Sequence, residues 1–547
     1  MFTIRVNTDL LENRIDSSFY NPIGLNATLQ LSQNLNVKSL KKVVNQSRKI
    51  TNGVRGPAWD NTEYKLIRLQ DCADWIVNVE GAASITKDQF YENRRCRLQA
   101  NDIVVAIGGY VGNASVVLDD CMAVIGQHSA VLPLNGNDLI DSRYLLSYLN
   151  CKYAEAIFSR YVSGTVQAGI NLEDLRELQS PTASLQAQTY IGNKVRQAER
   201  LRARARELRE AALNSVALCT LGDQSISMVE ELDASLGRIR KGILELPNLG
   251  DKAACEEVHI RVSADQIFDR IDSWYYKPEY ALIDTQIKSL EKYHDLLSIN
   301  LKSFADVQYG FMPLEDYWEE SKGHPFLRVT NICDDLLLDL SSIKFVNPDS
   351  SNNKRYRLSQ NDVLIVQCGN STGRIALVPE DIVDWAFPSF SLRLKIKKRG
   401  WDSGYLAAFL SSPLGKQQIQ RSVSITSVRP NTTKPAIENV LIPILQKGLQ
   451  EKIGTMVRSS VRIGLDSVKL TTAAKLLVEA LIEGQVAEAD LIAAQKALEA
   501  EDRTADREIL SRLTRKGMDV AGEPPLFPDL DGLYNALDAL NTSENVP

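Results

Sequence analysis

The chain has 547 residues, of which 44% are hydrophobic and 24% charged, and its formal net charge at pH 7 is −6. Its length is several times the roughly 100 to 200 residues of one domain, so we expect at least two domains. The acidic balance argues against a uniformly basic nucleic-acid coat, although local patches decide phosphate contact. The eight cysteines form no C-x-x-C pair, which disfavours a zinc site or a disulfide framework.

The N-terminal segment lacks the pattern of a secretory leader, and nowhere do about 18 apolar residues run without interruption. We therefore expect a cytoplasmic protein without membrane contact. Residues Ile4–Pro22, IRVNTDLLENRIDSSFYNP, return 256 positions later as Ile260–Pro278, IRVSADQIFDRIDSWYYKP. A repeat at this long period indicates that the architecture itself is repeated.

Further pairs of segments match in the same order along the chain. They are Arg94–Val105 (RRCRLQANDIVV) with Lys354–Ile365 (KRYRLSQNDVLI), Asp141–Leu149 (DSRYLLSYL) with Asp402–Leu410 (DSGYLAAFL), and the L-Q pairs at 185–186 and 449–450 with the residues after them. Chance similarities would not stay collinear over about 200 residues, so the matches indicate a tandem duplication.

Each copy has the same predicted order of elements. Apolar runs broken by Gly, Asn, Asp and Pro predict strands and turns, then come a short helix and an extended segment that ends at a proline boundary. The strand-rich stretch is expected at 40–135 in the first copy and at 300–397 in the second. The short helix is expected at 142–160 and 403–421, and the extended segment is expected to end at Ser180-Pro181 and Ile442-Pro443. The apolar stretches Asp102–Gly109 and Asp362–Val366 read as buried core strands.

A long helix follows each extended segment. In the first, Ile191, Ala198, Ala205 and Ala212 are spaced seven apart, which is typical of a coiled-coil seam. The second has a less regular apolar face that includes Ile453, Val457, Val461 and Leu465. The duplication favours an antiparallel pair within the chain over packing of each helix on its own domain.

We therefore predict an α+β protein with two tandem-duplicated, mixed, strand-rich domains that are separated by two long antiparallel helices, plus a helical C-terminal tail. The predicted boundaries are 1–184 for the first domain, 185–218 for the first long helix, 219–256 for a connector, 257–446 for the second domain, 447–483 for the second long helix, and 484–547 for a helical or partly disordered, partner-facing tail.

The sequence contains no recognisable catalytic constellation. It has no G-x-x-x-x-G-K-[ST] loop, no methyltransferase Asn/Asp-Pro-Pro-Tyr/Phe tetrapeptide, and only four, widely spaced histidines. A nuclease site built from scattered acids such as Asp60, Glu63 or Asp334 is an alternative that their spacing does not support. We expect no catalytic residue, no metal and no bound cofactor.

The ordered motifs resemble a known family over roughly residues 1–482. NDIVVAIGGYVGNA (Asn101–Ala114), its partner NDVLIVQCGNSTGRIA (Asn361–Ala376), the proline boundaries and the L-Q helix entries together resemble the target-recognition domains and conserved helices of type I restriction-modification specificity subunits. The repeated R-I-D-S-x-[FY]-Y preface and the C-terminal tail depart from the usual pattern. They leave open a related phage-defence methyltransferase complex.

The resemblance implies a non-catalytic subunit that reads a bipartite site in double-stranded DNA, with one half-site for each domain. It also implies two copies of a methyltransferase subunit as partners, which would bind S-adenosylmethionine, and a restriction or translocase subunit as a further candidate. A protein-interaction scaffold of a defence complex is the alternative; it would show no salt-dependent affinity for DNA.

Candidate DNA contacts are cationic or amide side chains near predicted turns and extended segments, where they can reach phosphates or base edges. Solvated charge runs and structural turns are the alternative interpretations. The candidates are Arg48, Lys49, Arg55, Arg94, Arg95, Arg97, Gln167, Asn171, Lys354, Arg355, Arg357, Arg374, Arg429 and Asn431.

Overall fold

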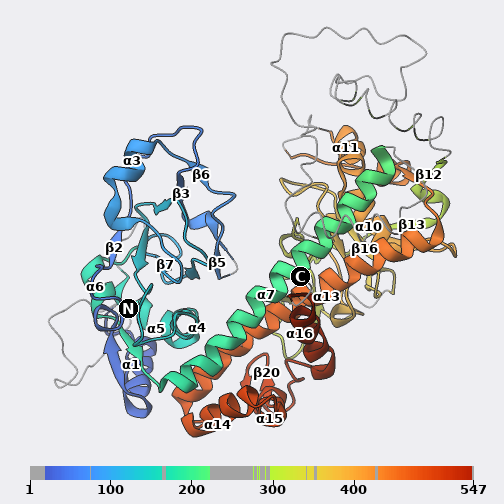
Figure 1. The fold of residues 1–547 in the computed structure, drawn as a ribbon. Coiled ribbons are helices and arrows are strands. Elements are labelled where there is room, and N and C mark those ends of the chain that lie inside the picture. Colours follow the sequence, from blue (N-terminus) through green and yellow to red (C-terminus); the bar gives the residue numbers. More distant parts are fainter. Residues whose placement is uncertain are drawn as a thin grey trace. The chain divides into compact units, whose positions relative to one another are not determined.

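The computed structural model divides into two compact units. The first unit comprises residues 1–201 and 466–547, and the second comprises residues 202–465. Figure 1 shows the chain coloured along its sequence. The structure describes residues 19–73, 75–162, 168–221, 275, 280, 283, 287, 290, 296–334, 336–340, 342–349, 354–424 and 429–544.

A mixed sheet forms the centre of the first unit. Its strand order is β2-β10-β7-β8-β5-β4, beside a smaller sheet of order β6-β3-β9. All four residues of β7 and of β10 are buried, as expected for the predicted apolar strand. The strands are β2 (Thr51–Asn52), β3 (Lys65–Ile67), β4 (Cys72–Ala73), β5 (Ile76–Val77), β6 (Ala83–Ser84), β7 (Ile103–Ala106), β8 (Ala114–Val116), β9 (Ala123–Ile125) and β10 (Ser129–Leu132).

Helices and one further strand pair complete the first domain. Strand β1 (Val37–Ser39) pairs antiparallel with β11 (Gln179–Pro181), the extended segment that the proline boundary predicted. The helices are α1 (Pro22–Asn34), α2 (Leu40–Val43), α3 (Lys87–Glu92), α4 (Ser142–Leu149), α5 (Lys152–Tyr161) and α6 (Leu172–Glu177). The fully buried Arg160 of α5 lies over the ring of Phe19 at 4.3 Å and donates to the Phe19 carbonyl.

The second unit repeats this arrangement. Its main sheet has the order β13-β18-β16-β17, and Arg421 lies over the ring of Tyr275 at 4.1 Å, as Arg160 does over Phe19. The strands are β12 (Ser298–Asn300), β13 (Ala305–Tyr309), β14 (His324–Phe326), β15 (Lys344–Val346), β16 (Val363–Val366), β17 (Ile375–Leu377), β18 (Ser391–Ile396) and β19 (Leu441–Pro443). The helices are α10 (Ser403–Ser411), α11 (Pro413–Arg421) and α12 (Lys434–Glu438). The predicted duplicated α+β class is confirmed.

The two long helices are α7 (Leu185–Leu221) and α13 (Lys447–Glu483), and each contributes one half to each unit. In the second unit they run antiparallel, side by side (Figure 1). The Ser460 hydroxyl donates to the Ala205 carbonyl at 2.7 Å, and Ala212 and Val216 share a core with Ile453 and Val457. The antiparallel helix pair expected from the duplication is therefore confirmed.

Each domain meets its long helix through the same four-residue arrangement. Asp141 caps α4, its backbone N–H donates to Gln188, and its carboxylate pairs with Arg196 at 2.5 Å beside Gly192. In the second unit Asp402, Gln450, Arg458 and Gly454 have the same roles.

This geometry corrects the alignment of the two L-Q motifs. Gln188, and not Gln186, occupies the position of Gln450, because only Gln188 contacts the capping aspartate. The first L-Q pair lies two residues before that position, and Leu185 is 54% exposed.

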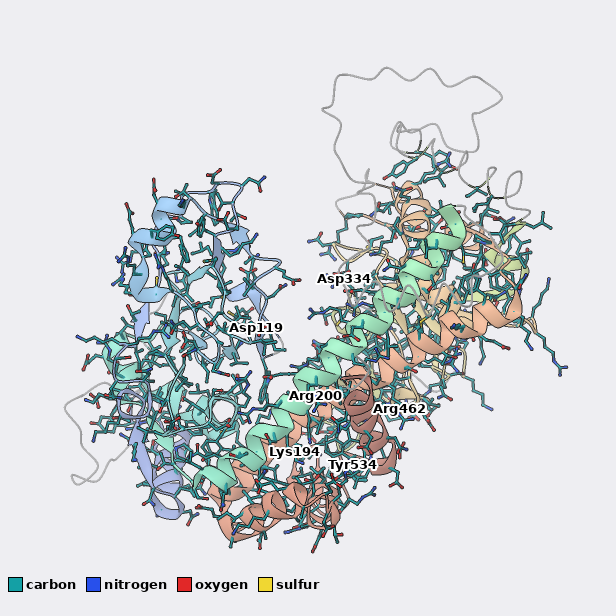
Figure 2. All side chains as sticks on the ribbon, in the orientation of Figure 1. Asp119, Lys194, Arg200, Asp334, Arg462 and Tyr534 are labelled. Carbon is teal, nitrogen blue, oxygen red and sulfur yellow. The ribbon has the colours of Figure 1, made fainter. Side chains whose placement is uncertain are left out.

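The C-terminal tail folds onto the first half of α7. It contains α14 (Glu488–Glu499), α15 (Thr504–Ser511), the hairpin β20 (Leu513–Thr514)–β21 (Gly517–Met518) and α16 (Leu530–Glu544), so the predicted helical tail is confirmed. Figure 2 shows Lys194 on α7 and Tyr534 on α16. Both side chains bind Asp506 of α15. Within the described residues, none of the helices combines the length and apolarity needed to cross a bilayer.

Candidate nucleic-acid interface

In the first unit, four loops that are distant in sequence meet at one face. Backbone hydrogen bonds tie them together: Val54 N–H donates to Ile125 O (2.8 Å), Gly108 N–H to His128 O (3.2 Å), and Gly109 N–H to Ala168 O (3.1 Å). We call residues 52–55, 108–110, 127–128 and 168–171 the first loop face. At Gly53 a Cβ would lie 1.9 Å from Ile125 O, so only glycine allows the loop after β2 to approach β9 this closely.

The second unit builds an equivalent face with the same backbone bonds. Phe311 N–H donates to Phe387 O (2.8 Å), Gln367 N–H to Phe390 O (2.8 Å), and Gly369 N–H to Pro430 O (2.9 Å). We call residues 309–314, 367–370, 389–390 and 429–431 the second loop face. Gly310 repeats the role of Gly53, since a Cβ there would lie 2.3 Å from Pro388 O.

The first loop face presents hydrogen-bonding groups. Arg55 and His128 are exposed, and the ring of Tyr110 at the tip of the glycine turn is 79% exposed. The guanidinium of Arg55 matches the two acceptors of guanine in the major groove, and the amide and imidazole groups beside it can bond other base edges. This arrangement is suited to contact with nucleic-acid bases.

Sequence reasoning did not select Tyr110 or His128. The glycine turn that carries Tyr110 could be recognised in the sequence, but no signal marked His128. His128 joins the face only because β-sheet hydrogen bonds bring the turn after β9 beside the glycine turn. That neighbourhood is non-local in sequence.

Several of the candidate cations, Arg48, Arg97 and Arg357 among them, have structural partners inside their own domain. Arg48 pairs with the buried Asp102 at 2.8 Å and donates to the Arg97 carbonyl. Arg97 lies over the rings of Phe90 and Tyr91 at 4.3 and 4.9 Å and donates to the Phe90 carbonyl at 3.2 Å. Removing either side chain would disturb packing as well as any DNA contact.

The equivalent Arg357 donates to the Asp384 carbonyl at 3.0 Å. The burial of His324 and the charge of Arg357 lower the pKa of the imidazole, which therefore stays neutral near pH 7.

The remaining candidates are distributed as follows. Arg374 is half-buried and pairs with Asp334 at 2.8 Å. Asn171 caps α6 through the Asp174 N–H, and Asn431 is half-buried between Cys368 and Ser424. Gln167 lies outside the described residues. The exposed candidates are Lys49, Arg55, Arg94, Arg95, Lys354, Arg355 and Arg429.

Arg94 and Arg95 lie close to the first loop face. They belong to a single helical turn, Arg94–Cys96, that packs against β2. Because β2 leads directly into the first loop face, these exposed guanidinium groups lie near it, and a guanidinium group can bond a phosphate.

The described part of the chain holds no group of three or more His, Cys, Asp or Glu side chains placed to bind a metal ion. Burial raises the pKa of Cys72 and Cys151 to about 12 and that of Cys121 and Cys219 to about 11. These thiols are protonated near neutral pH and are poor nucleophiles.

Residues 33–210 match the family model described as "Type I restriction modification DNA specificity domain". The resemblance is confirmed in the first copy. The matched segment includes every residue of the first loop face.

The specificity subunit of the type I restriction enzyme EcoBI from Escherichia coli is 26% identical over 188 residues, 34% of this chain and 39% of the relative. The chain therefore spans less than half the length of that relative.

Two solved structures are also similar. The S subunit of a type I restriction-modification system from M. genitalium covers 84% of this chain and 96% of its own, with 14% identity and a TM-score of 0.37. The HsdS subunit from Thermoanaerobacter tengcongensis covers 87% and 96%, with 15% identity and a TM-score of 0.23.

Proposed function

We propose that this chain is a sequence-specific DNA-binding specificity subunit that reads a bipartite site. In this proposal residues 1–184 and 257–446 are two recognition domains, each reading one half-site. One observation carries it: two copies of one backbone frame present loop faces with different side chains, and the first copy matches a DNA specificity domain. A conserved frame with divergent loops is what two different half-sites require.

Splitting the site has an energetic reason. A good bidentate contact discriminates against a wrong base by about 1 to 3 kcal/mol, and one small loop face can make only a few such contacts. Linking two faces in one chain makes binding of the second half-site intramolecular, which multiplies the selectivity without any larger domain.

The proposed partners supply the chemistry. A methyltransferase must flip its target base out of the duplex, a step that does not itself read the surrounding sequence, so discrimination falls to another surface. We propose that this non-catalytic chain directs two copies of a methyltransferase subunit, which bind S-adenosylmethionine, to DNA in the cytoplasm. A restriction or translocase subunit is a further proposed partner.

The proposal is tested by co-purifying the chain with the host's adenine methyltransferase subunit and mapping modified bases in cellular DNA with and without its gene. The expected result is a stable complex and loss of methylation at one bipartite motif in the deletion strain. An unchanged pattern of modified bases, with no methyltransferase bound, would instead favour the protein-interaction scaffold.

A further inference from the structure

The second loop face carries an unusual set of exposed apolar side chains. Tyr309 is 37% exposed, Phe390 46%, Met312 56% and Leu314 94%. Single exposed apolar residues are common, but a group of them on one face of a domain usually marks a binding site.

These side chains belong to one local surface. Phe390 lies in the turn that enters β18, and the Gly310 N–H beside Tyr309 bonds to Ser391 O at 3.4 Å. Met312 follows Phe311, whose carbonyl accepts from Ser389 N–H at 2.9 Å. Leu314 extends from the same loop and lies almost wholly in solvent.

The duplication identifies what stands at the same places in the first copy. Gly53 and Gly310 occupy equivalent positions, as do the turns that contain His128 and Phe390. On that alignment Asn52 corresponds to Tyr309, Arg55 to Met312, and His128 to Phe390. The first face is therefore hydrogen-bonding where the second is apolar.

We infer that the second loop face reads thymine, through the C5 methyl groups that thymine presents in the major groove. This inference rests on the proposed function, since it assumes that both loop faces meet DNA. Among the base edges exposed in the major groove, only that of thymine offers a methyl group, and apolar side chains are its natural partners. Leu314, Met312 and Phe390 are the specificity-determining residues in this assignment.

The charges around the loop support base contact over phosphate contact at this point. Glu315 and Asp316 directly follow Leu314 and are exposed, so they would repel a phosphate brought to the same place. Phosphates can instead be met by exposed cations outside this loop, such as Arg429 on another loop of the same face, Lys354 and Arg355. The apolar side chain of Leu314 can therefore approach the base edges inside the major groove.

The experiment uses the full chain in its methyltransferase complex and a pool of randomised duplexes, from which bound sequences are enriched. Each thymine of the enriched site is then replaced by uracil, which differs only by the missing methyl group. At contacted thymines we expect affinity to fall about fourfold per methyl, the effect of leaving one such group unburied. Uracil in the other half-site should change nothing.

Leu314→Ala and Phe390→Ala should bind thymine and uracil duplexes equally well, because the side chains that contact the methyl are gone. Leu297→Ala is the matched control: Leu297 is 54% exposed in the same unit but outside the second loop face, so its loss should preserve the discrimination. Because Leu314 is almost fully exposed, its substitution should leave folding intact.

Equal binding of thymine and uracil duplexes by the wild-type complex would overturn the inference, and so would full discrimination in both face variants. If Leu314→Ala left DNA discrimination intact but abolished methyltransferase binding, the face would be a protein-docking surface instead. Failure of the proposed function looks different, because the random pool would then yield no enriched sequence.

Discussion

Lys194 Nζ lies 2.5 Å from Oδ1 of Asp506, and both side chains are only 1% exposed. The hydroxyls of Tyr190 and Tyr534 donate to the same carboxylate at 2.7 and 2.5 Å. The carboxylate of Asp506 thus accepts hydrogen bonds from one ammonium group and two hydroxyls. Two of these three donors, Lys194 and Tyr190, lie on α7. A buried charge pair is costly to desolvate, but breaking one by removing a single partner is costlier still.

We expect Asp506→Ala to destabilise docking of the tail by about 3 to 5 kcal/mol, because it leaves the Lys194 ammonium buried without its partner. Hydrogen exchange of α16 measures this directly, and the effect should appear there before it appears in β7. The double variant Lys194→Met/Asp506→Leu should be much closer to wild type. Met456 shows that methionine is accepted at the equivalent helix position of the second copy. Equal damage in the single and double variants would contradict this account.

Acid should loosen the tail. Burial alone would raise the pKa of Asp506, but the charge of Lys194 and the hydrogen bonds from Lys194, Tyr534 and Tyr190 hold it below its ordinary value. A lowered carboxyl pKa gives stability that is complete above the unfolded pKa, about 4, and is lost as the pH falls through the folded value. Exchange protection of α16 should therefore decrease below about pH 4, with a smaller dependence in Asp506→Asn.

Gly454→Ala should weaken docking of the second domain on α13. A Cβ at Gly454 would lie 1.8 Å from Asp402 Oδ1, so Asp402 would have to leave both the α10 cap and Arg458. We expect the free energy of unfolding, measured in urea, to fall by about 1 to 3 kcal/mol. Gly448→Ala is the control on the same helix. No atom lies within 4 Å of its Cβ position, so better helix propensity should stabilise it by about 0.5 to 1 kcal/mol.

The candidate cations should separate into two classes. Arg55→Ala and Arg95→Ala remove exposed side chains, so we expect unchanged unfolding and weaker DNA binding in both. Arg95→Ala should also lower the salt slope by about one, as expected for a lost phosphate contact, whereas Arg55→Ala should relax the sequence preference, as expected for a lost base contact. Arg97→Ala should lower the free energy of unfolding, because its guanidinium contacts Phe90 and Tyr91. Binding titrations at several salt concentrations distinguish the classes. An unchanged salt slope in Arg95→Ala would contradict its role as a phosphate contact, and an unchanged sequence preference in Arg55→Ala would contradict its role as a base contact.

The duplication and the long helices could be predicted because they are written in the order and period of the residues. The heptad positions Ile191, Ala198 and Ala205 are indeed buried. The alignment of the two helix starts could not be predicted, since L-Q pairs occur at 178–179 and at 185–186. Only the contact with Asp141 identifies Gln188 as the equivalent of Gln450.

The loop faces were predicted only in part. The glycine turns and basic loops could be recognised individually, but their meeting depends on hydrogen bonds between distant segments, such as Val54 with Ile125. Separation in sequence likewise concealed that the loop of Leu314 shares a surface with the turn of Phe390. The packing of Arg97 on Phe90 and Tyr91 is local in sequence, but a run of basic residues does not show which of them packs on a ring. Residue type shows what a side chain can do, and the sheet decides which neighbours it has.

The negative net charge of the chain is concentrated in the docked C-terminal tail. Residues 484–547 contain thirteen acidic and six basic side chains, a net charge of −7, whereas the other 483 residues sum to +1. The low isoelectric point, near 5.6, therefore results mainly from the tail and not from the domains that carry the loop faces. On an anion exchanger the intact chain would be retained mainly through this one segment, and its acidity is no guide to how the rest of the chain meets a polyanion.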